Sequence, residues 1–245
     1  DKGKTHASGK LLFNCRVIPN RGSWLDFEFD VKDLLYFKID RKKKIFASTL
    51  LLALGFSKSE IVNEFYDSEV YSYDAKTGKW KTKFNPENYK AKNFSEEVLD
   101  AKTEKVVINL GEKVNYLSAK KLADEGLKDI LVSKESLIGK FLHSNVKINN
   151  EEDGTYSIGT EINETILQNI LDANINSLNV SITNSINKGP YLLTTLLNDK
   201  NNTKEEAITE IYKMLRPGEP PTIEIATQIF NNLFFSSDRY DLSDV

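Results

Sequence analysis

The chain has little of what covalent or metal chemistry requires. Its 245 residues include one cysteine, Cys15, and two histidines, His6 and His143. A single cysteine cannot form an internal disulfide, and Cys15 alternates with Phe13 and Val17, so we expect it to be buried in a protein of a reducing compartment. Neither histidine belongs to a metal-binding spacing such as His-Glu-x-x-His. The sequence therefore predicts no metal site.

Long apolar runs are also missing. No stretch approaches the ~20 apolar residues that span a bilayer, and the start Asp1-Lys2-Gly3-Lys4 has neither an initiator Met nor a signal-peptide core. Glycine-rich phosphate loops, dinucleotide fingerprints and serine nucleophile elbows are absent as well. We expect a cytoplasmic piece of a longer protein, with no membrane partner, no cofactor and no catalytic residue of its own.

Charge is unevenly distributed. The net charge is -3, yet the first 60 residues hold 12 Lys or Arg against 7 Asp or Glu, so the remainder is acidic. A basic end of this kind favours contact with a polyanion. The run Arg41 to Lys44 supplies four adjacent cations that can neutralise phosphates, and the alternative is an ordinary solvated charge run.

A large aromatic side chain lies on a polar strand face. Side chains alternate along residues 23–31, so the apolar ones share one face: Leu25, Phe27, Phe29 and Val31. The other face holds Trp24, Asp26, Glu28 and Asp30. Either the indole covers a neighbouring loop, or it offers a flat face to a nucleobase. Without an apolar pocket, the carboxylates are expected to be solvated rather than catalytic.

Regular secondary structure is predicted at both ends of the chain. Strands are predicted at 10–18, 23–31 and 34–40, and a buried helix at 46–54 that ends at Gly55. A capping box at Ser57 begins a second helix that runs to Tyr66. Near the carboxyl end, helices are predicted to begin after Gly189-Pro190 and at Thr203, the latter ending at Leu215, and to follow Thr222.

The middle of the chain has a different pattern, with short strands and polar turns. A hairpin is predicted over 70–84, and further strands at 105–110, 127–132, 139–148, 156–162 and 177–183. Helices are predicted at 118–125 and 163–173, and residues 85–100 read as a polar linker. The whole is expected to be an α+β protein in which a discontinuous domain, 1–66 with 188–245, is interrupted by a smaller mixed module, 67–187.

Five runs resemble the β subunit of bacterial RNA polymerase. They are 16–30 (RVIPNRGSWLDFEFD), 39–44 (IDRKKK), 189–191 (GPY), 210–222 (EIYKMLRPGEPPT) and 232–243 (NLFFSSDRYDLS). The runs are long and stand in the family's order, and they cover roughly the first 65 and last 60 residues. The middle is much less recognisable and, by its position, corresponds to the lineage-variable insertion of the family's lobe domain.

The resemblance implies a DNA-binding role for particular residues. Trp24 matches a tryptophan that approaches a non-template base near the start site. Asp40 and Lys42 match positions close to the same strand, and Arg216 matches an arginine near it, so with Arg41 they form the expected DNA-binding set. Where Lys42 stands, arginine is commoner in the family; lysine keeps the charge but loses the bidentate fork.

The resemblance also implies a setting. The chain would be a lobe region that lines the channel for promoter and downstream DNA, in an enzyme with α, β′ and ω subunits and a sigma factor. The catalytic Mg²⁺ would be held by β′. The insertion would dock regulators or simply decorate the surface.

Other interpretations remain open at this point. Arg216, at a helix end, could simply satisfy carbonyl groups, and residues 238–241 are expected to form an ion-pair network around Arg239. The whole chain could instead be a free-standing nucleic-acid-binding or scaffold protein that uses the helix pair at 46–66. An independent hydrolase is a third possibility, for which the sequence offers no motif.

Overall fold

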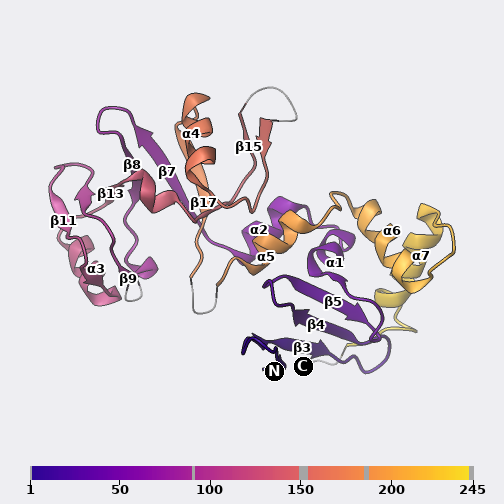
Figure 1. Ribbon diagram of the computed structural model, residues 1–245. Helices are drawn as coiled ribbons and strands as arrows, with labels where there is room; N and C mark the ends of the chain where they lie inside the picture. The colour runs from indigo at the N-terminus through magenta and orange to yellow at the C-terminus, as the bar shows by residue number, and fades with distance from the viewer. Residues whose placement is uncertain (1, 90–91, 149–153, 185–187, 243–245) are drawn as a thin grey trace. The chain divides into compact units, whose positions relative to one another are not determined.

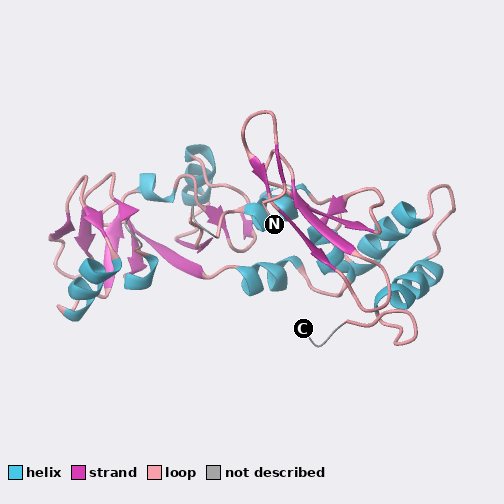
Figure 2. Cartoon of the chain, turned by 90° about the horizontal axis from the view of Figure 1, so that it is seen from below, coloured by secondary structure: helices cyan, strands magenta, loops and turns pink. Residues whose placement is uncertain are grey.

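The computed structural model describes residues 2–89, 92–148, 154–184 and 188–242. These residues form two compact units: a terminal unit, residues 1–65 with 184–245, and a middle unit, residues 66–183. The sequence predicted the two boundaries between these parts of the chain at residues 66/67 and 187/188. Both units mix helices with antiparallel strands (Figure 2), so the predicted α+β class is confirmed.

The terminal unit contains a four-stranded antiparallel sheet in the order β3-β4-β5-β6. Its strands are β3 (Asn14–Val17), β4 (Leu25–Phe29), β5 (Leu35–Ile39) and β6 (Ile45–Phe46), with a small separate pair, β1 (Lys4–Thr5) and β2 (Leu11–Leu12). The turn between β4 and β5 is fixed by Asp30, whose carboxylate accepts hydrogen bonds from the Lys32 and Leu34 amides at 2.8 and 3.0 Å. Such an Asx-type turn is what an aspartate at this position favours.

Helices from both ends of the chain complete this unit. They are α1 (Ala47–Ala53), α2 (Lys58–Phe65), α5 (Tyr191–Asn198), α6 (Lys204–Leu215) and α7 (Ile223–Phe234). Figure 1 shows α6 and α7 side by side, and α1 packs against α6. The predicted capping box of α6 is confirmed, because Thr203 Oγ1 accepts from the Glu206 amide at 3.2 Å and Glu206 accepts in return from the Thr203 amide.

The two ends are tied together by main-chain contacts. The Asp241 amide donates to the Arg21 carbonyl at 2.9 Å, and the Asn20 amide donates to the Asp241 carbonyl at 2.8 Å. Next to this bridge, Gly22 has φ +114°, and a Cβ there would lie 2.5 Å from the Tyr240 ring, so only glycine fits without a shift. Arg239 forms no ion pair in the described part of the chain, so the expected ion-pair network is wrong.

The expected burial of Cys15 is also wrong. Cys15 is exposed, as are all residues of β3. The reason is that β3 is the edge strand of its sheet and pairs with β4 alone among the described strands. Phe13, which shares the alternation with Cys15, is 51% exposed and separates β2 from β3, so the predicted strand 10–18 is broken there. The alternation of apolar side chains predicted which residues share a strand face, but it did not predict whether another element packs on that face.

The middle unit is built on a seven-stranded antiparallel sheet in the order β11-β10-β13-β8-β7-β17-β14. The strands are β7 (Ser68–Asp74), β8 (Lys79–Lys83), β10 (Val98–Asp100), β11 (Val106–Ile108), β13 (Asp129–Val132), β14 (Phe141–Leu142) and β17 (Ser177–Ser181). The smaller elements are β9 (Lys92–Asn93) with β12 (Lys113–Val114), β15 (Val146–Lys147) with β16 (Thr155–Tyr156), η1 (Pro86–Asn88), η2 (Lys134–Leu137), α3 (Tyr116–Asp124) and α4 (Glu164–Asp172).

The middle unit has its own apolar core. Trp80 from β8, Ile170 from α4 and Leu178 from β17 belong to one cluster, each with at most 1% of its surface exposed. The predicted hairpin is confirmed as β7 and β8, which pair in antiparallel register. Burial of this core against α3 and α4 is the main force that holds the unit together.

Three expectations for the middle unit are wrong. The predicted strand 139–148 is two short strands, β14 and β15, because the chain bends at His143 and Ser144 and the next side chain, Asn145, accepts a hydrogen bond from the Ile158 amide at 2.8 Å. The predicted strand 156–162 is reduced to β16. The expected linker 85–100 contains η1, β9 and β10, since Val98 is fully buried and joins the sheet.

Candidate nucleic-acid interface

The site begins where β4 starts and β5 ends. Asp40, which follows β5, binds the main chain of Trp24 in both directions: its carboxylate accepts from the Trp24 amide at 2.8 Å, and its own amide donates to the Trp24 carbonyl at 3.0 Å. Asp40 and Arg41 both have left-handed backbones, with φ values of 48° and 61°. Two consecutive non-glycine residues in this region are uncommon and cost energy. The corner is therefore held in place by its bonds to Trp24.

Two arginines flank the Trp24 ring. The guanidinium carbon of Arg16 lies 5.2 Å from the ring centroid and that of Arg41 lies 5.9 Å from it. Both distances fall within the range of cation–π attraction. Arg16 is also ion-paired with Asp26, its partner in the β3–β4 register, and this hydrogen bond raises the pKa of Arg16. The indole is half-buried and sits among cations rather than among carboxylates alone.

The carboxylates of this strand face are paired and not simply solvated as expected. Asp26 bonds Arg16, and Glu28 accepts from Lys38 on β5 at 2.7 Å. Arg16 was missed by sequence reasoning. The signal was present, because a hairpin register that pairs Leu25 with Val17 also pairs Asp26 with Arg16.

Lys42 and Arg216 both lie at the end of α6. The Lys42 ammonium donates to the carbonyl of Leu215, the last residue of α6, at 3.2 Å. The Arg216 guanidinium instead pairs with Glu219 at 3.2 Å, and both side chains are about half exposed. Lys42, rather than Arg216, thus satisfies the helix carbonyl. This contact brings Lys42 beside the residue that precedes Arg216, while Asp40 and Arg41 contact Trp24.

The four residues of the basic run 41–44 have different side-chain surroundings. Arg41 lies over Trp24, Lys42 caps α6, and the Lys44 ammonium lies 4.2 Å from the Tyr36 ring centroid. Lys43 is exposed, and its side chain forms no hydrogen bond, ion pair or ring contact with a described residue. All four cations face solvent at least in part, which suits them to screen phosphate charge.

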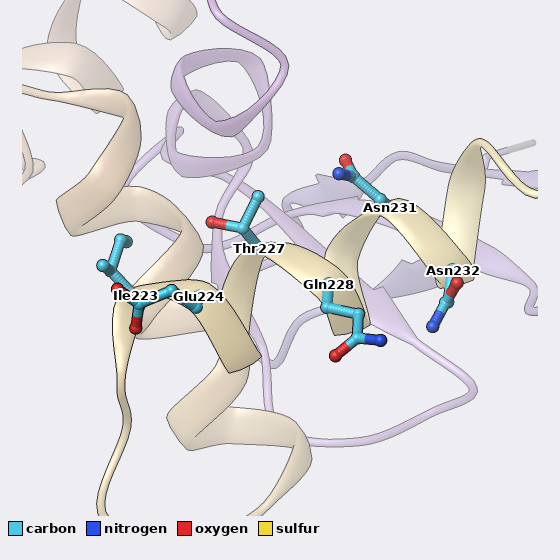
Figure 3. Close-up of a pocket in the computed structure, with 6 residues that line it drawn as sticks. All are labelled: Ile223, Glu224, Thr227, Gln228, Asn231 and Asn232. Carbon is cyan, nitrogen blue, oxygen red and sulfur yellow. The ribbon is translucent and has the colours of Figure 1, made fainter.

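Among the residues that the structure describes, no three His, Cys, Asp or Glu side chains gather as a metal site, and no described helix is long and apolar enough to cross a bilayer. A shallow groove of about 470 Å³ runs along α7 (Figure 3), lined by Ile223, Glu224, Thr227, Gln228, Asn231 and Asn232. None of the predicted DNA-binding residues lines it.

His143, in the middle unit, has a structural role. It is buried, its Nδ1 lies 2.9 Å from Ser181 Oγ, and its amide donates to the Asn179 carbonyl at 3.0 Å. Burial lowers its pKa, against a smaller opposing effect of Asp67. These contacts hold β14 on β17.

Comparison with known proteins identifies the family. A family model described as RNA polymerase Rpb2, domain 2, matches residues 13–153, more than half of the chain. The β subunit of DNA-directed RNA polymerase from Rickettsia akari (strain Hartford) is 46% identical over all 245 residues. The chain belongs to the RNA polymerase β-subunit family. The β subunits of Rickettsia felis and Rickettsia prowazekii are 45% and 44% identical over the same length.

The chain spans 18% of the length of these β-subunit relatives. They match it over its full length, so the middle unit is shared with them, and the family model itself extends through most of that unit.

Arginine is distributed unevenly within this β-subunit segment. All five arginines lie in the terminal unit: Arg16, Arg21, Arg41, Arg216 and Arg239. Planar cations that stack and bind phosphate are therefore concentrated where the candidate site lies.

Proposed function

We propose that this chain is the lobe region of an RNA polymerase β subunit, and that its terminal unit forms one wall of the DNA channel. There it contacts promoter and downstream non-template DNA during DNA-templated RNA synthesis. One observation supports the proposal: Arg41 lies over the Trp24 ring, and Lys42, the next residue, bonds the carbonyl of Leu215 beside Arg216.

The chemistry of this surface suits a melted strand. An aromatic ring offers a stacking face to any base, worth about 1–3 kcal/mol, and nearby cations attract the backbone without regard to sequence. Asp40 has a different task from the others, since its carboxylate is engaged by the Trp24 amide. It supports the tryptophan and is not free to contact a base through that oxygen.

The rest of the assembly supplies catalysis. In this proposal the segment holds no catalytic residue, and the Mg²⁺ that joins ribonucleotides is held by β′. The partners are the α, β′ and ω subunits, a sigma factor and DNA in the cytoplasm, at the nucleoid. The middle unit, as an insertion in the lobe, would dock regulators.

A free-standing nucleic-acid-binding or scaffold protein is the weaker proposal. Its reading helix would be α2, whose exposed residues include Glu60 and Glu64. Carboxylates on that surface repel phosphates. The match of the whole chain to a short part of a much longer subunit also favours the lobe.

Trp24→Ala tests the proposal in reconstituted polymerase. Loss of the stacking face should shorten the lifetime of the open promoter complex by about tenfold, as expected for a loss of ~1.4 kcal/mol. Trp24→Phe, which keeps a ring, should retain most of the lifetime. Tyr116→Ala removes an exposed aromatic from the middle unit and serves as the matched control. Equal lifetimes for Trp24→Ala and the control would contradict the proposal.

A further inference from the structure

The Trp24 ring is not an open surface in this structure. Arg16 and Arg41 both lie over it, at 5.2 and 5.9 Å, and the two arginines are held differently. Arg16 is tied to Asp26 by an ion pair across the β3–β4 register. Arg41 is exposed and has no ion-pair partner among the described residues. Arg16 is therefore held at the ring by its ion pair, whereas the ring is the only hydrogen-bond, ion-pair or ring-contact partner of the Arg41 side chain among the described residues.

The backbone explains why Arg41 reaches the indole. Asp40 and Arg41 are left-handed, and this corner is stabilised by the two hydrogen bonds between Asp40 and the Trp24 main chain. An unusual backbone conformation that is held by specific contacts points to a functional constraint. Here its effect is to direct the Arg41 side chain back over the ring of Trp24, whose main chain Asp40 binds.

We propose that Arg41 is a displaceable cover on Trp24, positioned by Asp40, and that a nucleobase of single-stranded DNA takes its place on the ring. The inference rests on the proposed function and adds a specificity step to it. A base stacks on the ring only if its stacking is stronger than the cation–π contact of Arg41 that it displaces. The released guanidinium is then free to pair with a backbone phosphate. A phosphate without a base does not lift the cover.

The cover can be tested without DNA. Trp24 and Trp80 are the two tryptophans, and Trp80 is fully buried, so acrylamide quenching of the chain's fluorescence reports on Trp24. Arg41→Asn suits the left-handed backbone and is too short to reach the ring. It should raise the quenching constant of Trp24 about twofold. Lys43→Asn removes an equal charge from the same segment and should leave quenching unchanged. Identical quenching in both variants would overturn the cover.

The exchange is tested with two probes of equal length, an oligothymidylate and an oligomer of abasic sites. Both variants lose one cation, so both should bind the abasic oligomer equally less tightly than the parent chain. Arg41→Asn should bind oligothymidylate about twofold to fivefold more tightly than Lys43→Asn, because the base no longer has to displace Arg41 from the ring. Equal affinities of the variants for oligothymidylate would overturn the exchange.

The experiments distinguish a wrong arginine cover from a wrong DNA contact. If no variant binds either oligomer while the quenching difference remains, both nucleobase exchange and the proposed DNA contact are contradicted, but the arginine cover stands. If the oligomers bind and the variants quench alike, the DNA contact stands and the cover is wrong.

Discussion

At the scale of single residues, one buried carboxylate joins the two ends of the chain. Asp199, 4% exposed, accepts hydrogen bonds from Ser48 Oγ at 2.5 Å and Thr49 Oγ1 at 2.9 Å, both on α1. Its other oxygen accepts from the Asn201 amide and side chain, each at 2.9 Å. A buried charge is tolerated only when it is bonded in this way. The cluster is thus a polar clamp between α1 and the segment after α5.

Asp199→Ala should destabilise the terminal unit strongly. The substitution leaves two buried hydroxyl groups and the Asn201 amide without their acceptor, which costs about 3 kcal/mol. Urea unfolding followed by Trp24 fluorescence would show a lower midpoint. Lys200→Ala, at the exposed neighbouring position, is the control and should have little effect. A midpoint equal to that of the control would show that the clamp contributes nothing.

Trp24 and Cys15 also show which features could not be predicted from the sequence. The alternation around Trp24 predicted its half-polar strand face, but the charges that surround the ring come from other strands and turns. Arg41 reaches it through a left-handed corner that no local pattern encodes. Cys15 was misjudged because burial depends on what packs over a strand, and β3 lies at an edge.

At the scale of elements, start and stop signals were the most reliable. The capping box at Thr203 and the N-cap at Thr222 were predicted and are formed. These signals work because caps satisfy orphan amides within a few residues. Short strands such as β14, β15 and β16 were misjudged in length, because their ends are set by strand pairing, of β14 with the distant β17 and of β15 with β16.

The β14–β17 edge should be sensitive to acid through His143. Burial lowers the pKa of His143 in the folded unit, whereas in the unfolded chain it is about 6.5. As pH falls below about 6.5, the unfolded chain takes up a proton that the folded unit resists. Stability is therefore complete above that pH and declines toward the folded pKa.

This pH dependence can be isolated with His143→Gln. Unfolding followed by Trp80 fluorescence at about pH 7.5 and about pH 5.5 should show a steeper acid loss in the parent chain than in the variant. His6→Gln, at the exposed histidine of the terminal unit, should retain the parent's steep loss. The interpretation fails if parent and His143→Gln lose stability equally.

At the scale of the whole molecule, the two units differ in how they are assembled. The middle unit is continuous in sequence and its core cluster lies within residues 71–180. Expressed alone, residues 66–183 should therefore fold and unfold in one cooperative transition, because its core cluster is formed by its own residues. Heat unfolding followed by Trp80 fluorescence and by far-ultraviolet circular dichroism should give coincident curves. A gradual, featureless melt would contradict the independence of this unit.

The discontinuity of the terminal unit has a consequence for synthesis. On the ribosome, β3 to α2 emerge first, and their partners α5 to α7 follow only after the 118 residues from 66 to 183. At ordinary elongation rates this delay is on the order of ten seconds. During that time the nascent sheet and α1 lack α5 and α6, while the later-emerging unit can already complete its own core. The part of the chain translated first is thus the last to mature.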